Sequence, residues 1–175
     1  IISAKDRSGD QVTIKGQYHW ARNHRIESVK FVHSGESVNL ITSSLMHGTN
    51  GDNTLHGVSW TGNYLHGLDG NDHLYGNKWN DFLNGGKGAD ILKGGYGNDT
   101  FVYSAFEDST INETDIIEDF TIGQDKIDLS ALEIAFSEIT IEQQHGMTSL
   151  SVDNQDFEIN LKSELKLSES DFILA

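Results

Sequence analysis

The stretch GGKGADILKGGYGNDTFV (Gly85–Val102) contains two copies of a nine-residue unit, and this unit decides the fold of the chain. Each copy has glycines in its first half, an aspartate at its sixth position and a large apolar residue at its eighth. A fixed short period indicates a repeat architecture and not an ordinary globular core. Four less regular copies come before these two, and they read GTNGDNTLH (48–56), GVSWTGNYLH with one extra residue (57–66), GLDGNDHLY (67–75) and GNKWNDFLN (76–84).

The last three residues of each unit alternate outward, inward and outward, as a short strand does, and the first six form a turn. Scattered glycine, asparagine and aspartate otherwise mark loops or a linker, but one apolar residue at the same phase in every unit favours strands. The sequence therefore predicts an all-β chain built on a right-handed parallel β-roll. Its inward positions would form one apolar ladder of Leu55, Leu65, Leu74, Leu83, Leu92 and Phe101.

Charge divides the chain into three segments. Residues 1–47 carry 4 acids and 6 bases, residues 48–102 carry 6 and 3, and residues 103–175 carry 17 and 3, which together give the net charge of −15. We expect a β-rich N-terminal segment at 1–47, the roll at 48–102 and a C-terminal capping β-sheet at 103–175. So acidic a cap argues against nucleic acid or an anionic membrane as the main partner. No apolar run approaches the roughly 18 residues of a membrane span.

The sixth positions of the units are expected to form two rows of carboxylates. Consecutive turns lie on opposite edges of a roll, so each turn stacks on the turn two units away, about 4.8 Å from it. Two carboxylates at that separation repel by about 3 kcal/mol at an effective dielectric near 20. A hard cation with many oxygen ligands removes this repulsion, and calcium suits such a site better than magnesium, which demands a stricter octahedron.

The sequence therefore predicts calcium sites between stacked turns. The best sites are expected between turns 67–72 and 85–90 and between turns 76–81 and 94–99, and a site between the first and third turns stays open. Thr61 and Trp79 replace the glycine at the fourth position, which disfavours a site between the second and fourth turns. About two to four ions are expected, with ligands among the side chains of Asp72, Asp81, Asp90, Asp99, Asn53 and Asn63 and the backbone of Gly67, Asp69, Gly70, Gly85, Lys87, Gly88, Gly94 and Gly97.

Glycine content links folding to the metal. Of 18 glycines, 13 lie between Gly48 and Gly97, and each costs roughly 0.5–1 kcal/mol relative to alanine when ordered in regular structure. The inward side chains return only roughly 1.5–3 kcal/mol each and must also offset the remaining backbone entropy. We expect the repeats to be disordered in low calcium and to fold outside the cell. With no cysteine, the chain has no disulfide to supply rigidity instead.

The repeats resemble those of the RTX family, the haemolysin-type calcium-binding proteins of bacteria. The run Gly97–Leu132 is similar to the segment that closes the roll in alginate C5-epimerase R-modules and serralysin-type metalloproteases, and Gly9–Leu40 resembles the β-rich domain that often precedes RTX repeats. The last residues, Glu169–Ala175, look like an uncleaved type I secretion signal. An apolar strand packed on the cap would explain the same residues. The resemblance implies a secreted protein, with calcium and the type I secretion machinery as partners.

No sequence signature of catalysis is present. The chain lacks an H-E-x-x-H zinc helix, a G-x-S-x-G elbow, a phosphate loop and a cysteine nucleophile. Histidines near the repeats could form a zinc cluster, although exposed strand histidines are the ordinary explanation; they are His47, His56, His66 and His73. We expect a non-catalytic module of a larger protein.

Two functions follow for such a module. The first is calcium-driven folding that supports secretion and stability of the larger protein. The second is binding of an acidic, alginate-like polysaccharide, as the likeness to R-modules implies. Candidate ligand-binding residues combine bases and aromatic rings: Arg22, Arg25, Lys15, Lys30, Tyr18, Trp20, Tyr64 and Phe82. The ordinary explanations are a solvated face for the bases and packing against the flanking segments for the rings.

Overall fold

The computed structural model describes residues 2–5, 11–15, 28–31, 37–38 and 43–175. The chain divides into two compact units, Ile1–Ser44 and Leu45–Ala175, and each is described by itself. In the first unit, neighbouring strands pair antiparallel in the order β1-β2-β3-β4. These strands are β1 (Ile2–Lys5), β2 (Gln11–Lys15), β3 (Ser28–Phe31) and β4 (Ser37–Val38).

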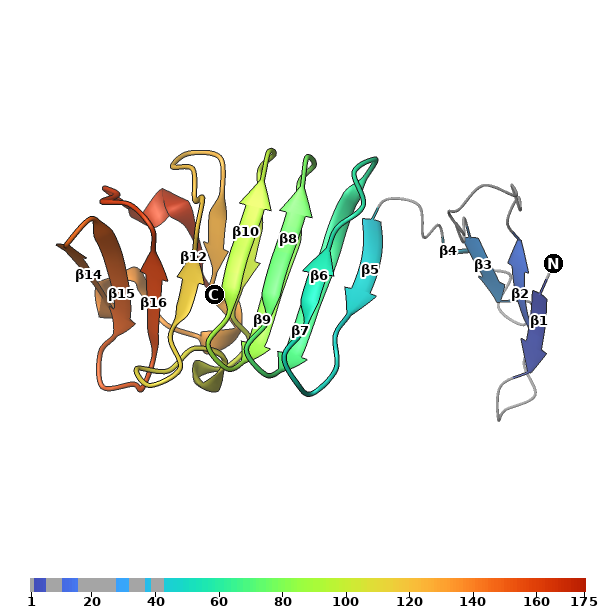
Figure 1. Cartoon of the computed structure of the whole chain (residues 1–175), viewed down its shortest axis with the longest axis horizontal. Helices are drawn as coiled ribbons and strands as arrows, with labels where there is room; N and C mark the ends of the chain where they lie inside the picture. Colours follow the sequence, from blue (N-terminus) through green and yellow to red (C-terminus); the bar gives the residue numbers. More distant parts are fainter. Residues whose placement is uncertain (1, 6–10, 16–27, 32–36, 39–42) are drawn as a thin grey trace. The chain divides into compact units, whose positions relative to one another are not determined.

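The repeats form the predicted parallel β-roll, in which consecutive strands alternate between two sheets (Figure 1). Each turn carries the chain from one sheet to the other, so successive strands lie in opposite sheets. Each strand therefore pairs in parallel with the strand two units away. One sheet contains β6 (Thr54–His56), β8 (His73–Asn77) and β10 (Ile91–Gly95). The other contains β5 (Ser43–His47), β7 (Gly62–Asp69), β9 (Phe82–Lys87) and β11 (Thr100–Val102).

The cap continues both sheets and does not form a separate layer. Strand β12 (Asp115–Ile117) adds in parallel to β10, and β13 (Lys126–Asp128) adds in parallel to β11. The first sheet then ends with β16 (Glu158–Leu161), β15 (Met147–Val152) and β14 (Ile139–Gln144), and the second with β17 (Phe172–Ile173). Short 3-10 helices connect these strands: η2 (Phe106–Asp108), η3 (Ser130–Leu132), η4 (Phe136–Glu138) and η5 (Glu169–Asp171).

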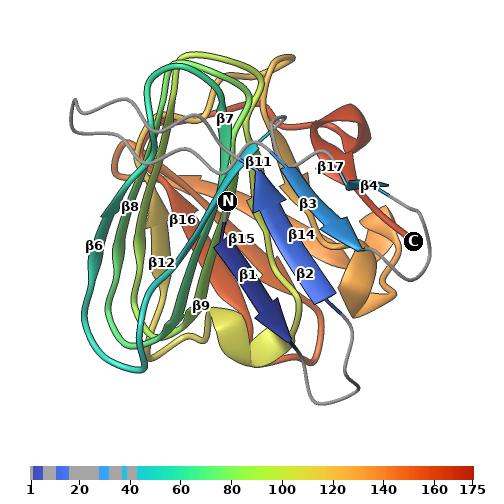
Figure 2. The same ribbon diagram turned by 90° about the vertical axis from the view of Figure 1, so that its right-hand side faces the viewer.

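The core lies between the two sheets. Figure 2 shows this unit from one end, with β6, β8 and β12 in one sheet and β9 and β11 in the other. The predicted apolar ladder is confirmed, since its five members from Leu65 to Phe101 have no exposed surface. Leu55 is only partly buried, because β6 is the last strand of its sheet. Ile117 and Ile127 extend the ladder into the cap.

The C-terminal residues pack on the cap as a strand. Strand β17 pairs in parallel with β13, matching Phe172 to Ile127. The Phe172 side chain is buried, and its ring lies 5.5 Å from that of Phe136. This is the packed strand that was the alternative to a secretion signal for these residues.

Candidate metal-binding edges

Strand register aligns the sixth positions of the repeats in two rows. Thr54, His73, Ile91 and Ile116 lie side by side in one sheet, so the residues just before them are also aligned. Tyr64, Phe82, Thr100 and Lys126 are aligned in the same way in the other sheet. We call the first row, Asn53, Asp72, Asp90 and Asp115, the first edge, and the second row, Asn63, Asp81, Asp99 and Asp125, the second edge.

One carboxylate oxygen of each aspartate in these rows binds the backbone of the preceding layer. On the first edge, the N–H groups of Asn53, Asp72 and Asp90 donate to the Oδ1 atoms of Asp72, Asp90 and Asp115 over 2.6, 2.7 and 2.8 Å. On the second edge, the N–H groups of Asn63, Asp81 and Asp99 donate to Asp81, Asp99 and Asp125 over 2.6, 2.9 and 2.9 Å. These bonds fix each side chain with its second oxygen pointing away from the donor.

The second oxygen of most of these carboxylates is buried and has no hydrogen-bond partner. A buried acceptor without a donor costs about 1–3 kcal/mol, and more when it is charged. Several such atoms in two regular rows mark a place where a positive charge is needed, because native proteins leave few buried polar atoms unsatisfied. The atoms are Oδ2 of Asp72, Asp81, Asp90, Asp99 and Asp115.

Four of these five oxygens, all except that of Asp115, point into a space kept open by a glycine. A side-chain carbon on Gly67 would lie 2.1 Å from Oδ2 of Asp72 and 2.4 Å from the carbonyl oxygen of Gly85. On the second edge, a carbon on Gly76 would lie 2.4 Å from Oδ2 of Asp81 and 2.5 Å from the carbonyl oxygen of Gly94. A carboxylate oxygen and a carbonyl oxygen thus share one small space, which suits a cation and excludes a side chain.

The electrostatics of the rows agree with this geometry. Burial raises the pKa of Asp90 to about 7, and the negative charges of Asp72 and Asp108 add to the effect. Burial likewise raises the pKa of Asp99 to about 7, and the negative charges of Asp125, Asp81 and Asp119 add to the effect. Burial also raises the pKa of Asp72, Asp81 and Asp125, and it raises that of Asp115 well above the usual range. The carboxylates therefore resist ionisation until a positive charge compensates them.

The donor set fits calcium. In the part of the chain that the structure describes, no three side chains of histidine, cysteine, aspartate or glutamate converge as a metal cluster. A cation at these edges would therefore combine carboxylates from stacked layers with backbone carbonyls. Oxygen ligands in flexible geometry are what calcium takes in proteins, whereas zinc prefers nitrogen and sulfur.

The backbone conformation at the fourth position of a unit differs between turns. Gly70, Gly88 and Gly97, at the fourth position of their units, all have positive φ, which non-glycine residues adopt at a cost. Thr61 and Trp79 stand at that position elsewhere and have no positive φ, so their turns differ in conformation, as their sequence suggests. The side chains of Asp69 and Lys87 are exposed, and the Lys87 carbonyl accepts the Gly70 N–H over 2.8 Å.

Sequence reasoning missed three acidic residues at the edges. Asp115 and Asp125 continue the two rows into the cap. Asp119 accepts the N–H groups of Gly94 and Gly95 over 3.0 Å each. The signal for the first two was present, because D-x-I at 115–117 and 125–127 repeats the aspartate-to-apolar spacing of the roll without its glycines.

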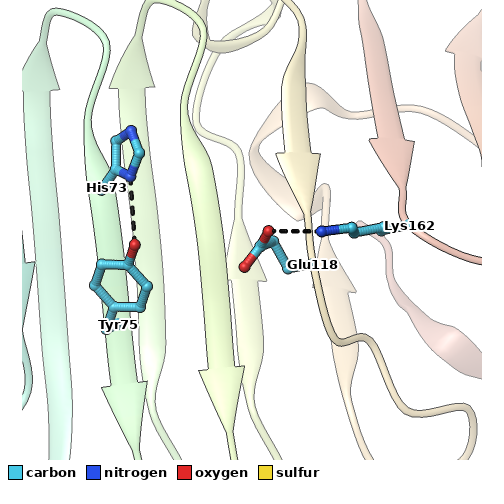
Figure 3. A network of polar contacts seen from close by, with 4 residues as sticks. All are labelled: His73, Tyr75, Glu118 and Lys162. Atoms are coloured by element: carbon cyan, nitrogen blue, oxygen red, sulfur yellow. Dashed lines mark hydrogen bonds and ion pairs between the residues drawn. The ribbon is translucent and has the colours of Figure 1, made fainter.

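The outward faces of the sheets carry the histidines and aromatic rings. His56 stacks on Tyr75 at 4.8 Å, and Nδ1 of His73 lies 3.3 Å from the Tyr75 hydroxyl (Figure 3). On the opposite sheet, Tyr64 and Phe82 stack with ring centroids 6.3 Å apart. These two candidate residues therefore lie together on one face of the roll. The remaining ligand-binding candidates divide between strand positions, Lys15 on β2 and Lys30 on β3, and positions outside the described residues, Tyr18, Trp20, Arg22 and Arg25.

Fold and edges together define a class: a parallel β-roll module whose repeats place buried carboxylates along both edges. The family model described as "Peptidase M10 serralysin C terminal" matches residues 48–173. The chain therefore belongs to the serralysin C-terminal domain family, and the RTX-type resemblance seen in the repeats is confirmed. No curated protein matches the chain significantly.

Solved structures share the fold. The AlgE6R3 subunit of the mannuronan C5-epimerase from Azotobacter vinelandii is 33% identical, with a TM-score of 0.60 over 73% of this chain and 81% of that one. The AlgE6R2 subunit of that epimerase is 29% identical, with a TM-score of 0.61 over 76% and 92%. The extracellular lipase LipA from Serratia marcescens is 21% identical, with a TM-score of 0.58 over 99% of this chain and 29% of the lipase, and shares the fold.

The chain thus resembles repeat modules that are parts of larger enzymes. Within the residues that the structure describes, no helix has the length and apolar character needed to cross a bilayer.

Proposed function

We propose that this chain is a non-catalytic module that binds calcium along both edges of its roll, folds outside the cell and supports the export and stability of a larger protein. The observation that carries the proposal is the set of buried Oδ2 atoms without partners. Calcium would supply the positive charge that these oxygens and the neighbouring carbonyls lack.

The sites that the geometry supports best are the two expected from the sequence. Between turns 67–72 and 85–90, Oδ2 of Asp72 faces the Gly85 carbonyl; between turns 76–81 and 94–99, Oδ2 of Asp81 faces the Gly94 carbonyl. The free Oδ2 atoms of Asp90 and Asp99 offer further ligands where the roll meets the cap. The chain's own part is to hold these oxygens in place through backbone hydrogen bonds to Oδ1 and to exclude water by burial.

Calcium titration tests the proposal. Protein treated with EDTA is returned to calcium-free buffer, calcium is added, and far-ultraviolet circular dichroism follows the roll while equilibrium dialysis counts bound ions. We expect β-structure to appear cooperatively as two or more ions bind, at free calcium on the order of 10⁻⁴–10⁻³ M. Magnesium at the same concentration serves as the control. A spectrum that does not change with calcium, or protein that retains no calcium after dialysis, would contradict the proposal.

Export is the second part of the proposal. The serralysin-type family and the RTX-like repeats support a type I substrate that crosses to the outside unfolded in low calcium. A protein carrying this module is expected in the culture medium only when the secretion machinery is present. Deletion of 169–175 should reduce export, and if export were unaffected the C-terminal residues would have only a packing role.

A specific observation also favours polysaccharide binding. Phe82 is 45% exposed although it stacks on Tyr64, and an exposed flat ring pair is a common platform for sugar rings, while bound calcium attracts carboxylates. We propose an acidic polysaccharide such as alginate as the ligand. Isothermal titration in calcium should show heat with wild-type protein and at least about tenfold weaker binding with Phe82→Ala, which removes about 1.4 kcal/mol or more. No heat with wild-type protein would exclude this second function.

A further inference from the structure

The second edge begins with an asparagine whose amide nitrogen lies among oxygens. Nδ2 of Asn63 is 2.7 Å from Oδ1 of Asp81 and 3.1 Å from the Gly76 carbonyl oxygen. It is also 3.2 Å from the carbonyl oxygen of Val58 and 3.3 Å from that of Thr61. Three carbonyls and a carboxylate thus surround one nitrogen, and an NH₂ group has only two hydrogens to share among them.

The orientation of this amide follows from its other bond. Oδ1 of Asn63 accepts the Val58 N–H over 2.8 Å. If the amide were turned over, its NH₂ group would face the Val58 N–H, and its oxygen would face the three carbonyl oxygens and the carboxylate. The hydrogen-bond network therefore fixes the nitrogen in its present position. Asn63 has no exposed surface, so its amide is not in contact with bulk solvent.

The same space in the following layers holds oxygen in place of nitrogen. A carbon built on Gly57 would lie 2.5 Å from Nδ2 of Asn63 and 2.2 Å from the Gly76 carbonyl. The equivalent carbon on Gly76 meets Oδ2 of Asp81 and the Gly94 carbonyl, two oxygens with no hydrogen between them. In the second turn, the Asn63 amide donates a hydrogen bond to the Gly76 carbonyl oxygen. In the fourth turn, the Asp81 and Gly94 oxygens have no hydrogen between them, so a cation is required to hold them together.

Asn53 shows that asparagine alone does not produce this arrangement. On the first edge, a carbon on Gly48 would lie 2.2 Å from Oδ1 of Asn53 and 2.4 Å from the Gly67 carbonyl. The Asn53 amide nitrogen instead donates to Oγ1 of Thr49 over 3.0 Å. Asn53 therefore still presents an oxygen to its glycine space, while Asn63 presents a donor.

We infer that the Asn63 amide takes the place of a calcium ion between the second and fourth turns, so that this layer closes without metal and the second edge binds one ion fewer than its register allows. The inference rests on the proposed calcium function. It also implies that a carboxylate at this position would convert the layer into a calcium site, because the carbonyls of Val58, Thr61 and Gly76 already surround the space.

Ion counting tests the inference. Wild-type protein, Asn63→Asp and Asn63→Ala are saturated with calcium, and bound ions are counted by native mass spectrometry and equilibrium dialysis. We expect Asn63→Asp to bind one ion more than wild-type protein and Asn63→Ala to bind no additional ion. An equal count in Asn63→Asp and wild-type protein would overturn the inference. Wild-type protein without calcium would overturn the proposed function, so the two failures are distinguishable.

A second measurement needs no variant. In calcium-saturated wild-type protein, the side-chain NH₂ of Asn63 should exchange with solvent at least about tenfold more slowly than that of Asn53, since only the former is buried and shared among four oxygens. Nuclear magnetic resonance of the assigned side-chain amides gives both rates in one sample. Equal and rapid exchange of the two amides would contradict the arrangement.

Discussion

Two buried aspartates, Asp171 near the C-terminus and Asp90 in the roll, differ in what their oxygens bind. Asp171 in the cap and Asp90 in the roll are each 1% exposed. Both oxygens of Asp171 accept hydrogen bonds, from the Gly123 N–H and from the N–H and hydroxyl of Ser168, whereas Oδ2 of Asp90 has none. Burial raises the pKa of both carboxyls. In Asp171 the bonds from Ser168 and Gly123, together with the charge of Lys126, outweigh burial and lower the pKa, whereas in Asp90 burial prevails.

This difference teaches how a structural carboxylate is distinguished from a metal ligand. Low exposure alone does not separate them, and neither does residue type. Asp108 in the cap also differs from Asp90, because its Oδ2 accepts the N–H groups of Ser104 and Ala105 over 2.7 and 3.1 Å and neither of its oxygens is a buried atom without a partner. A buried carboxylate satisfied by the protein caps a turn; one left with a free oxygen requires a cation.

The largest expected effect on calcium binding is the difference between removing a carboxylate of the roll and removing one of the cap. Asp90→Ala is expected to lose at least one bound calcium and to raise the calcium midpoint of folding about tenfold or more, because the ion loses a charged ligand. Titration followed by circular dichroism, with ions counted by dialysis, measures both effects.

The matched variant in the cap is Asp171→Ala. It should keep the wild-type ion count and lose about 1–3 kcal/mol of stability in calcium, since only hydrogen bonds to a charged group are removed. Thermal unfolding in saturating calcium gives that value. If both variants lost the same number of ions, the distinction between the two kinds of aspartate would be wrong.

The pH dependence should have opposite signs in the two regions. Asp90 and Asp99 have a pKa of about 7 in the fold, above the unfolded value of about 3.9. The folded roll then binds more protons than the unfolded chain between about pH 4 and 7, and its metal-free stability falls as pH rises through that window. In EDTA, we expect circular dichroism to show more β-structure near pH 5 than near pH 7.5.

Asp171 contributes in the other direction. Its pKa is lowered in the fold, so its contribution to stability is present above the unfolded value and is lost as pH falls through the folded value. With calcium present, acid should also weaken the roll because protons compete with the ion for the carboxylates. A metal-free roll that gains β-structure as pH rises from 5 to 7.5 would contradict the raised pKa values.

The smallest effect is expected at the surface of the cap. Lys162 lies 3.0 Å from Glu118 (Figure 3), and its side chain is 63% exposed. Exposed ion pairs of this kind contribute about 0–1 kcal/mol. Lys162→Ala should therefore lower stability by no more than that in thermal unfolding, with an unchanged calcium midpoint. A shift of the midpoint comparable to that of Asp90→Ala would place this pair among the determinants of calcium binding.

The repeat made the roll predictable. The spacing of one apolar residue in nine fixed the inward ladder from Leu65 to Phe101, and the turn-on-turn stacking placed Asp72 beside Asp90 and Asp81 beside Asp99, as the strand register confirms. These features depend only on strand alternation and on parallel pairing two units apart, so a single sequence is sufficient to derive them.

The features that could not be predicted depend on individual side-chain bonds. Asp115 and Asp125 were missed as members of the rows because the turns before them lack the glycines of the template. Asn53 and Asn63 looked equivalent, yet one presents oxygen and the other nitrogen to its glycine space. In both turns Oδ1 accepts the N–H of the second residue, Thr49 or Val58. The difference lies in Nδ2, which donates to the Thr49 hydroxyl in Asn53 and to Asp81 and the Gly76 carbonyl in Asn63.

Amide hydrogen exchange tests the central claim most directly, because the backbone N–H groups of Asp72 and Asp81 donate to the carboxylates of the next layer. These two amides should be strongly protected in millimolar calcium at pH 7.5 and should exchange at nearly unfolded rates in EDTA. If they remained equally protected after the calcium had been removed, the edges would close without a cation, and calcium would not be what holds the roll together.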